Sequence, residues 1–396
     1  MSRCIAANFA SDMHASDITS LLVALCDICL VGAFVGCLFT LLEAWFVLRF
    51  PGEQVPSVCP QSPVTVLKPL HGTEPDLAAR LARFCEQDYA APVQLVFGAR
   101  DETAPAVAVA RKLAADFPDK AIDVVVDVRR HGGNRKVCNL INMLPAARHD
   151  TVVLSDSDIL VEPDYLRDVT ALLAPSRVGA VTCLYYGIGN GLWGRLSALA
   201  TNAHFLPQAI AASGLGLEQP CCGATIALQR SMLDRIGSFG AFADMLADDY
   251  AIGAAIRSLG YDVVTAPFLV GHRCFEDSLY RLILHQLRAA RTIRSIEPVG
   301  YAGSIITHPF ALALVGLLSG SSTAALLVAA AFTSRLALCR CVERRFRLPR
   351  QSYWLIPLHD VVAFAVYVAS FFGANVNWQG ADYRVTADGK LVERKA

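Results

Sequence analysis

Two aspartates one residue apart, Asp156 and Asp158, are the side chains in this 396-residue sequence that most directly indicate chemistry. They follow Thr151-Val-Val-Leu154, a short β-branched run that is typical of the end of a buried strand. Open α/β sheets bind ligands at the carboxyl ends of their strands. Two carboxylates there can share a hard divalent cation with the oxygens of a diphosphate. Asp and Ser are also common where a strand exits into a turn, so the spacing alone leaves both interpretations open.

Three further polar clusters follow predicted strands or open predicted helices. They are Gly98-Ala-Arg-Asp101, Gly133-Asn-Arg-Lys-Val-Cys-Asn139 and Leu246-Ala-Asp-Asp-Tyr250. Each cluster alone also has a structural explanation: Asp101 as a turn residue, Asn134 as a helix cap, and the aspartate pair as a first-turn pair favoured by the helix dipole.

An alternation of strand and helix patterns from residue 64 to about 267 supplies the elements that would position these clusters. It predicts a doubly wound α/β sheet. The predicted strands are 64–67, 93–98, 122–128, 151–154 and 180–184, and the predicted helices are 74–87, 104–116, 136–147 and 164–173. Lys68 follows the first strand, and no glycine-rich dinucleotide fingerprint is found there. A G-x-G-x-x-G motif occurs at residues 189–194, but it comes too late in the sheet to predict a dinucleotide site.

The composition indicates a membrane protein with a soluble middle. Hydrophobic residues make up 54% of the chain, charged residues 18%, and the mean hydropathy is +0.42. The net charge is zero, which argues against nucleic-acid binding through overall basicity. The scattered cysteines favour a reducing compartment.

The distribution of apolar and basic residues predicts six regions. These are an N-terminal transmembrane anchor (1–50), a linker (51–63), a cytoplasmic catalytic domain (64–275), an interfacial amphipathic helix (276–300), membrane segments (301–375) and a cytoplasmic tail (376–396). The apolar stretch 305–338 suggests a hairpin, and 353–372 is either a further span or a re-entrant segment. We therefore expect a multi-pass membrane protein with its soluble domain in the cytoplasm.

Taken together and in this order, the motifs resemble the inverting glycosyltransferases of the GT-A fold, and most closely the ceramide glucosyltransferase family, family 21. The matching stretches are Leu67-Lys-Pro-Leu70, Asn134-Arg-Lys136 with Asn139-Leu140, Asp156-Ser157, Asp248-Asp-Tyr250 and His285-Gln-Leu-Arg288-Ala289. The resemblance covers roughly residues 20 to 385. Gly300-Tyr-Ala-Gly-Ser304 and Thr307-His-Pro309 are similar to the bacterial hopanoid-biosynthesis branch of this family. Only this resemblance implies that the membrane is the bacterial inner membrane.

The resemblance implies a role for each motif. Asp249 would be the catalytic base, and Arg288 would offset charge on the departing UDP. Asp158 with Asp156 would hold Mg²⁺ or Mn²⁺. The residues implied to bind the nucleotide-sugar are Lys68, Asp101, Asn134, Lys136 and Asp156.

The expected function is transfer of glucose or N-acetylglucosamine from a UDP-sugar to a hydroxyl of a membrane lipid, with a hopanoid polyol ahead of ceramide or diacylglycerol. Two departures from the family pattern bear on the acceptor: Ala289 replaces a Trp, and His285 replaces Gln or Arg. A third, Gln379 in Trp378-Gln-Gly-Ala-Asp-Tyr383, lies near the expected nucleotide site. A processive polysaccharide synthase and a non-catalytic nucleotide-sugar-binding scaffold remain as alternatives.

Overall fold

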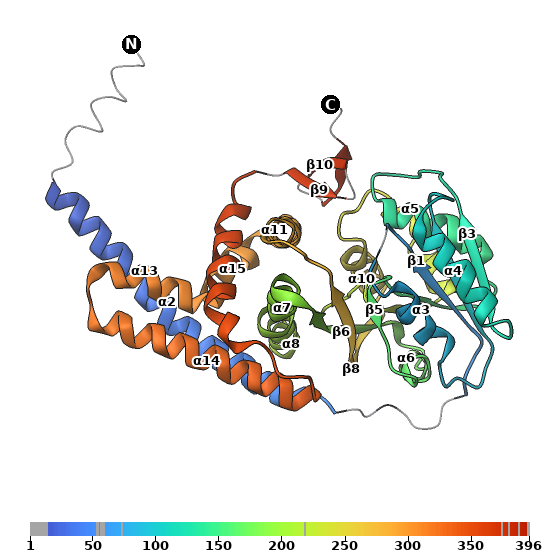
Figure 1. Cartoon of the computed structure of the whole chain (residues 1–396), viewed down its shortest axis with the longest axis horizontal. Helices are drawn as coiled ribbons and strands as arrows, with labels where there is room; N and C mark the ends of the chain where they lie inside the picture. The colour runs from blue at the N-terminus through green and yellow to red at the C-terminus, as the bar shows by residue number, and fades with distance from the viewer. Residues whose placement is uncertain are drawn as a thin grey trace, which may run out of the picture.

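One mixed β-sheet forms the centre of the α/β domain (Figure 1). The computed structural model describes residues 15–52, 55, 60–72, 74–217, 219–373, 375–378, 381–386 and 389–393. Within them, the strand order of this sheet is β3-β2-β1-β4-β7-β6-β8-β5. The strands are β1 (Val64–Pro69), β2 (Val93–Ala99), β3 (Ala121–Val126), β4 (Thr151–Leu154), β5 (Ile159–Leu160), β6 (Val178–Gly189), β7 (Ile226–Gln229) and β8 (Asp262–Cys274).

The direction of the strands changes in the middle of the sheet. Strands β3, β2, β1 and β4 are parallel, whereas β7 runs antiparallel to both β4 and β6. The five predicted strands are all present, and the α/β fold class is confirmed. Strands β5, β7 and β8 were not predicted. The residues of β8 do not alternate between buried and exposed with a period of two, because its burial pattern is irregular and its pairing with β6 contains register shifts.

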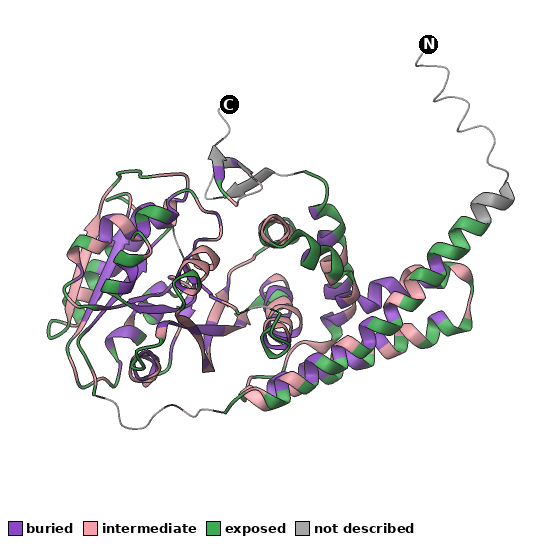
Figure 2. Cartoon of the chain, turned by 180° about the vertical axis from the view of Figure 1, so that it is seen from behind, coloured by how far each residue is buried: buried purple, intermediate pink, exposed green. Residues whose placement is uncertain are grey.

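Helices cover both faces of the sheet, which explains why the strands are continuous apolar runs. One face packs against α3 (Leu77–Cys85), α4 (Pro105–Asp116) and α6 (Tyr165–Leu173), and the other against α5 (Arg135–Met143), α9 (Arg230–Arg235) and α10 (Asp248–Ser258). Successive residues of β1 point to opposite faces: Val66 belongs to the first core and Leu67 to the second. Figure 2 shows these central strands as buried.

A broken helix follows β6. It consists of α7 (Gly191–Ala200), a π-helical turn η2 (Thr201–Phe205) and α8 (Leu206–Gly214). The glycine motif at 189–194 has a packing role here, because a Cβ on Gly189 would lie 1.8 Å from the carbonyl oxygen of Gly194. Glycine lets the strand end approach the first turn of α7.

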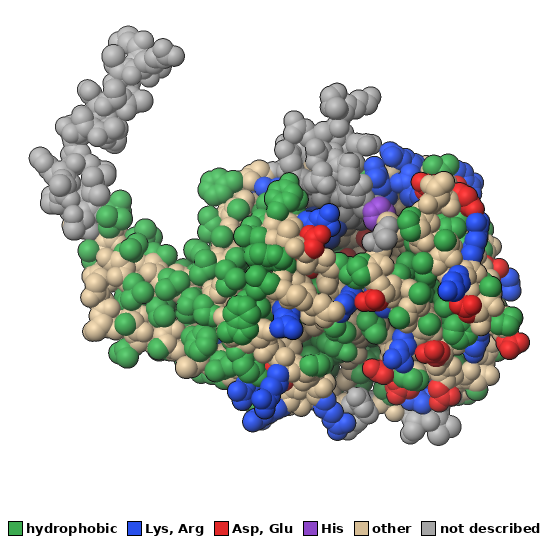
Figure 3. Space-filling view, viewed as in Figure 1, with side chains coloured by type: hydrophobic (Ala, Val, Ile, Leu, Met, Phe, Trp, Pro, Cys, Tyr) green, Lys and Arg blue, Asp and Glu red, His purple; other side chains and the backbone are tan. Residues whose placement is uncertain are grey.

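A group of apolar helices lies on the opposite side of the molecule from β3 (Figure 1). They are α2 (Ala15–Arg49), α13 (Pro309–Gly316), α14 (Ser322–Phe346) and α15 (Ile356–Ser370). Among the described residues, three segments are long and apolar enough to cross a membrane: Ser20–Arg49, Ser322–Phe346 and Tyr353–Ser370. Figure 3 shows hydrophobic side chains gathered over these helices.

The predicted hairpin at 305–338 is present as α13 and α14, which turn at Gly320 and pack against each other, but a bend precedes its short first arm. The helices from Pro298 to Thr307 and from Pro309 to Ser319 are bent by 64° relative to each other, and α14 follows as a separate long helix. The first part of the bent pair contains α12 (Pro298–Gly303) and the 3-10 turn η4 (Ser304–Thr307). Pro309 explains the bend, because it lacks the N–H group that a continuous helix would need there.

The basic helix α11 (Leu279–Ile296) connects the catalytic domain to these segments. Arg291 Nη2 donates to Phe372 O and Arg294 Nη2 donates to Gly373 O, each at 2.9 Å. Two of the arginines that predicted a membrane-surface helix therefore bind carbonyl groups at the end of α15. The position of α11 relative to a membrane stays a prediction.

A small sheet of β9 (Asn375–Trp378), β10 (Ala381–Val385) and β11 (Leu391–Glu393) ends the described chain. Leu391 N donates to Asp244 O at 2.7 Å, which attaches this sheet to the loop before α10. Part of the predicted linker (residues 53–54 and 56–59) and of the predicted tail (379–380, 387–388 and 394–396, which includes Gln379) lies outside the described residues.

Candidate active site

Two buried cations support the Asp156-Ser157-Asp158 turn between β4 and β5. Lys68 Nζ donates to Asp156 O at 2.8 Å and to Ser155 Oγ at 3.3 Å. Arg80 Nε donates to Ser157 O at 3.2 Å. Their side chains are almost completely inaccessible to solvent, so they hold the backbone of the turn from beneath.

This position changes the interpretation of Lys68. The family resemblance implied that Lys68 binds the nucleotide-sugar. Its side chain is 0% exposed and its ammonium group lies 3.7 Å from the centre of the Phe84 ring. Burial lowers its pKa to about 7, although the nearby aspartates act in the opposite direction. The contacts of Lys68 are those of a support for the turn.

Glu74 completes this support. It accepts a hydrogen bond from Ser157 Oγ at 2.5 Å and forms an ion pair with Arg80 at 2.7 Å. The turn is thus held through successive carbonyls and through the side chain of its middle residue. Such fixation preorganises the two aspartates for binding.

His272 on β8 is paired with Asp158, the second aspartate of the turn. Its Nε2 lies 3.3 Å from Asp158 Oδ2. Burial disfavours both charges, but the mutual attraction is stronger: it lowers the pKa of Asp158 to about 2 and raises that of His272 well above its usual value. Sequence reasoning missed His272 because it belongs to no recognisable motif. The pairing of Ile159 on β5 with His272 on β8 brings it to the site.

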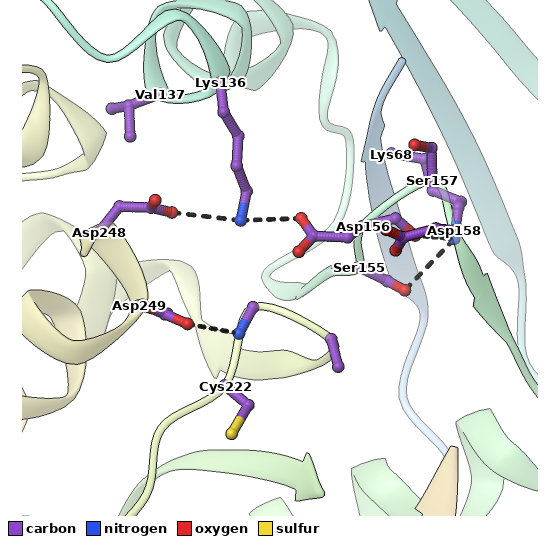
Figure 4. A network of polar contacts seen from close by, with 12 residues as sticks. Lys68, Lys136, Val137, Ser155, Asp156, Ser157, Asp158, Cys222, Asp248 and Asp249 are labelled. Carbon is purple, nitrogen blue, oxygen red and sulfur yellow. Dashed lines mark hydrogen bonds and ion pairs between the residues drawn. The ribbon is translucent and has the colours of Figure 1, made fainter. Parts of the chain in front are cut away.

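Lys136 lies between two carboxylates from different parts of the chain (Figure 4). Its Nζ is 2.8 Å from Asp156 Oδ1 and 3.3 Å from Asp248 Oδ2. Burial opposes its charge, yet the nearby aspartates raise its pKa above the usual value. Burial and the charge of Asp158 raise the pKa of Asp156 to about 6, whereas Lys136 lowers it.

Asn134 fixes the start of α5 and hence the position of Lys136. Its Oδ1 accepts a hydrogen bond from Val137 N at 3.0 Å, as expected of a helix N-cap. Its Nδ2 donates to Met245 O at 2.7 Å and to Asp248 Oδ1 at 3.2 Å. The structural explanation for Asn134 therefore holds, and the same residue connects two of the predicted clusters.

Asp249 lies in the first turn of α10, close to the Lys136–Asp156 pair. Its Oδ2 accepts a hydrogen bond from Gly223 N at 2.9 Å. Burial and the adjacent Asp248 raise its pKa. A Cβ on Gly223 would lie 2.8 Å from Lys136 Nζ and 2.9 Å from Asp156 Oδ2, so a larger residue would displace at least one of these side chains. Gly223 is a site residue that its Cys222-Gly-Ala-Thr225 context did not reveal.

Arg288 on α11 is within electrostatic reach of the turn. Burial lowers its pKa, while Asp158, Asp156 and Glu276 act in the opposite direction. His285, one turn earlier, pairs with Glu276 at 2.5 Å. The His285 departure from the family pattern is thus matched by a carboxylate partner in this chain.

Asp101 is the predicted site residue that lies outside this network. It is exposed, and its Oδ1 accepts hydrogen bonds from Thr103 N at 2.8 Å and Thr103 Oγ1 at 2.7 Å. These bonds are those of a local turn, as its structural explanation suggested. Figure 4 shows Lys136, Asp156, Asp158 and Asp249 together with Lys68. Asn134 joins this group through its hydrogen bond to Asp248, whereas the contacts of Asp101 are local.

The donor atoms at the turn suit a metal ion that is shared with a substrate. In the part of the chain that the structure describes, no group of three or more His, Cys, Asp or Glu side chains could hold a metal ion by itself. Mg²⁺ is usually bound by one or two carboxylates together with substrate phosphates, and Mn²⁺ also accepts imidazole nitrogen. Asp158 provides carboxylate oxygens, and His272 provides a nitrogen donor only after it has lost the proton that faces Asp158, whereas the carboxylate of Asp156 is paired with Lys136.

A mixed sheet of this order, with an Asp-x-Asp turn and a helix-borne aspartate at its carboxyl edge, is a fold of the GT-A type that glycosyltransferases share. The particular family follows from comparison with known proteins: the sequence pattern of glycosyl transferase family 21 matches residues 28–391. The chain therefore belongs to family 21, and the family prediction is confirmed. The narrower resemblance to the hopanoid branch stays a prediction.

Known proteins similar to this chain include enzymes that act on different substrates. Ceramide glucosyltransferase 1 of Caenorhabditis elegans is 27% identical over 199 residues, which are 50% of this chain and 42% of that protein. The chain thus spans less than half of this curated relative. The mannosyltransferase PcManGT from Pyrobaculum calidifontis, solved with GDP-Man and Mn2+, has a TM-score of 0.54 and 22% identity, covering 89% of this chain and 99% of the other. The latter similarity establishes the fold.

Proposed function

We propose that this protein is an inverting glycosyltransferase of the membrane that moves glucose or N-acetylglucosamine from a UDP-sugar to a hydroxyl of a membrane lipid. The observation that carries the proposal is the placement of Asp249 and of the Asp156–Asp158 turn around Gly223. One site thereby contains a candidate base and candidate diphosphate ligands.

The base assignment follows from the environment of Asp249. An inverting transfer needs one group that takes the proton from the acceptor hydroxyl as its oxygen attacks C1 of the sugar. In that step the oxygen–C1 bond forms and the bond from C1 to the diphosphate breaks, so UDP leaves with the electron pair. Burial and Asp248 raise the pKa of Asp249, which makes it a better proton acceptor than a solvated aspartate.

The charged groups of the site would bind the donor, either directly or through a metal ion. Asp158 and His272, with Asp156, would hold Mg²⁺ or Mn²⁺, and such an ion acts as a Lewis acid and template for a diphosphate. Arg288 would offset the charge that develops on UDP, and Lys136 would approach the uridine or a phosphate. Asp101, whose described contacts are local, would accept hydrogen bonds from the uracil or ribose through its Oδ2, and Lys68 and Asn134 would keep the surrounding loops in place.

The apolar helices support a lipid acceptor. Three of them are long enough to cross a membrane, and α11 connects them to the catalytic domain. The similar ceramide glucosyltransferase is an enzyme whose name gives a lipid acceptor. We favour a hopanoid polyol because of the motifs at 300–304 and 307–309, with ceramide or diacylglycerol as alternatives, and place the catalytic domain on the cytoplasmic side of a bacterial inner membrane.

A transfer assay tests the proposal against its alternatives. Purified membranes that contain the protein are incubated with radiolabelled UDP-glucose or UDP-N-acetylglucosamine and each of the three lipids. A lipid-soluble product with one sugar is expected. An insoluble polymer would indicate a processive synthase, and nucleotide-sugar binding without any product would indicate a scaffold.

A further inference from the structure

A second group of buried polar side chains lies where the apolar helices meet the catalytic domain. Its members come from five segments: Glu43 of α2, His204 of η2, His308 between η4 and α13, Arg335 of α14, and His359-Asp360 of α15. Except for His204, each of these residues is at most 4% exposed. We call this group the interhelical polar cluster.

Arg335 holds the interhelical polar cluster together. Its Nη1 donates to Ala203 O at 2.8 Å and its Nη2 to Thr307 O at 2.7 Å. Its Nε lies 3.5 Å from Asp360 Oδ1, which is also 2.9 Å from His359 Nδ1. Glu43 is close enough to interact with both Arg335 and Asp360.

The imidazole rings face one another across these helices. The ring centre of His204 lies 5.0 Å from that of His308 and 5.8 Å from that of His359. The irregular backbone at η2 and at the 64° bend places His204 and His308 here. Breaks of this kind are frequent at functional sites and need partners for the polar groups that they free.

Many polar atoms of the cluster have no hydrogen-bond partner among the described residues. They are Glu43 Oε1, His204 Nδ1, His308 Nδ1, His359 Nε2 and Asp360 Oδ2. Native proteins leave only a few buried polar atoms unpaired per hundred residues, so this concentration leaves donors and acceptors that water or a polar ligand would satisfy.

The charges of the cluster select the chemistry of that occupant. A phosphate would meet the carboxylates of Glu43 and Asp360, and a metal ion would meet the guanidinium of Arg335. Neutral hydroxyl groups fit better, because each can donate to a carboxylate or imidazole and accept from an imidazole N–H. The cluster lies about two turns inside the end of α2 at Arg49. If α2 crosses the membrane as proposed, this position is near the headgroup region, where lipid hydroxyls lie.

A row of rings connects the cluster to the candidate active site. Tyr185 lies 5.2 Å from His272, the partner of Asp158, and stacks on Phe205 at 4.8 Å. Phe205 directly follows His204 in η2. A bound headgroup at the cluster would therefore be next to the segment that contacts the metal-binding side of the site.

We propose that the interhelical polar cluster is the subsite that binds the hydroxyl-bearing headgroup of the lipid acceptor. The inference rests on the proposed function and deepens it. It also gives a role to two polar interruptions of the apolar sequence, Thr307-His-Pro309 and His359-Asp360, which the donor site does not use.

The first test replaces two imidazoles by rings that keep their packing. For H204F and H308F, we expect the KM for the lipid acceptor to rise about tenfold, as for loss of a buried hydrogen bond. The KM for the UDP-sugar and the rate of UDP-sugar hydrolysis without lipid should stay at the wild-type values. Y367F is the matched control, because it removes a hydroxyl that binds Ala302 O in the same helical layer. An unchanged acceptor KM in both histidine variants would overturn the proposal.

A second test uses the wild-type protein and so does not depend on the folding of a variant. Ceramide, diacylglycerol and a hopanoid polyol, each with a diazirine beside a hydroxyl, are photolysed with the protein in phosphatidylcholine vesicles. At least one probe should label residues 201–208, 305–310 or 356–362, and its O-methyl ether should not. Labelling elsewhere, or equal labelling by the ether, would overturn the proposal and would leave water as the partner of the unpaired atoms. Absence of any sugar transfer to the three lipids would instead contradict the proposed function, independently of where the probes attach.

Discussion

His272 Nε2 lies 3.3 Å from Asp158 Oδ2, although the two residues are 114 positions apart in the chain. Asp158 belongs to the motif that the sequence reveals, and His272 belongs to a strand that it does not. The contact is made because β5 pairs with β8. It keeps Asp158 ionised to lower pH and places the Nε2 of His272 beside the carboxylate, where it becomes a metal donor only in the neutral form of the ring.

We expect H272Q to weaken divalent-cation binding and to reduce kcat/KM by about 100-fold, the order seen when one fixed electrostatic partner of a transition state is lost. Mn²⁺ titration followed by transfer rate measures the first effect. H149Q, which changes a histidine in the loop before β4 and so at the opposite end of this strand from Asp158, is the control. A variant with wild-type dependence on Mn²⁺ would remove His272 from the metal-binding role.

The same pair predicts how stability depends on pH. The pKa of Asp158 is lowered, so its contribution is present above the unfolded value near 3.9 and is lost as pH falls towards about 2. The pKa of His272 is raised, so its contribution is present below the unfolded value near 6.5 and is lost as pH rises through the folded value. The difference in melting temperature between wild type and H272Q in detergent should be largest from about pH 4 to 6.5. A constant difference at all pH values would contradict this.

For Asp249, we expect D249N to reduce transfer by at least about 100-fold while UDP binding changes little. The amide keeps the hydrogen-bonding shape of the carboxylate but cannot take a proton from the acceptor. UDP affinity by calorimetry and transfer rate with saturating donor separate the two effects. D262N, at an exposed ion pair with Arg177, serves as the control. Normal turnover of D249N would exclude it as the base.

The position of Gly223 makes a small substitution informative. In G223A the new methyl group would meet Lys136 Nζ and Asp156 Oδ2 at under 3 Å, so the pair must separate. We expect a loss of about tenfold or more in kcat/KM for the donor, since small displacements in a preorganised site are costly. G240A, where a Cβ meets nothing within 4 Å, should retain full activity. Equal activity of the two variants would show that Gly223 is not confined by the site.

Lys68 tests whether support of the turn matters for donor binding. We expect K68M to raise the KM for the UDP-sugar, because Asp156 O loses its buried donor. The lowered pKa of Lys68 means that folding disfavours its charged form, and this penalty is largest below about pH 7 and disappears as pH rises towards 10.5. The stability of wild type relative to K68M should therefore increase from pH 7 to 10. A KM for the UDP-sugar equal to that of wild type would show that Lys68 does not position the turn for donor binding.

The sequence by itself determined the local features of this protein. Apolar runs of strand length predicted β1 to β4 and β6, because burial on both faces of a sheet requires them. The Asp-x-Asp turn, the Asn134 cap and the first-turn position of Asp249 followed from residue types at element boundaries. The long apolar segments likewise predicted the candidate spans, although not the bend at Pro309.

Tertiary structure alone decided which of these residues meet. It placed His272 and Gly223 in the site, moved Lys68 beneath the turn and left Asp101 on an exposed turn of its own. It also gathered charged residues from five segments into the interhelical polar cluster. Periodicity in a sequence reports only which face of its own strand or helix a residue occupies. The partners across that face depend on strand pairing and helix packing between distant segments, and these set the burial and charge on which the chemistry depends.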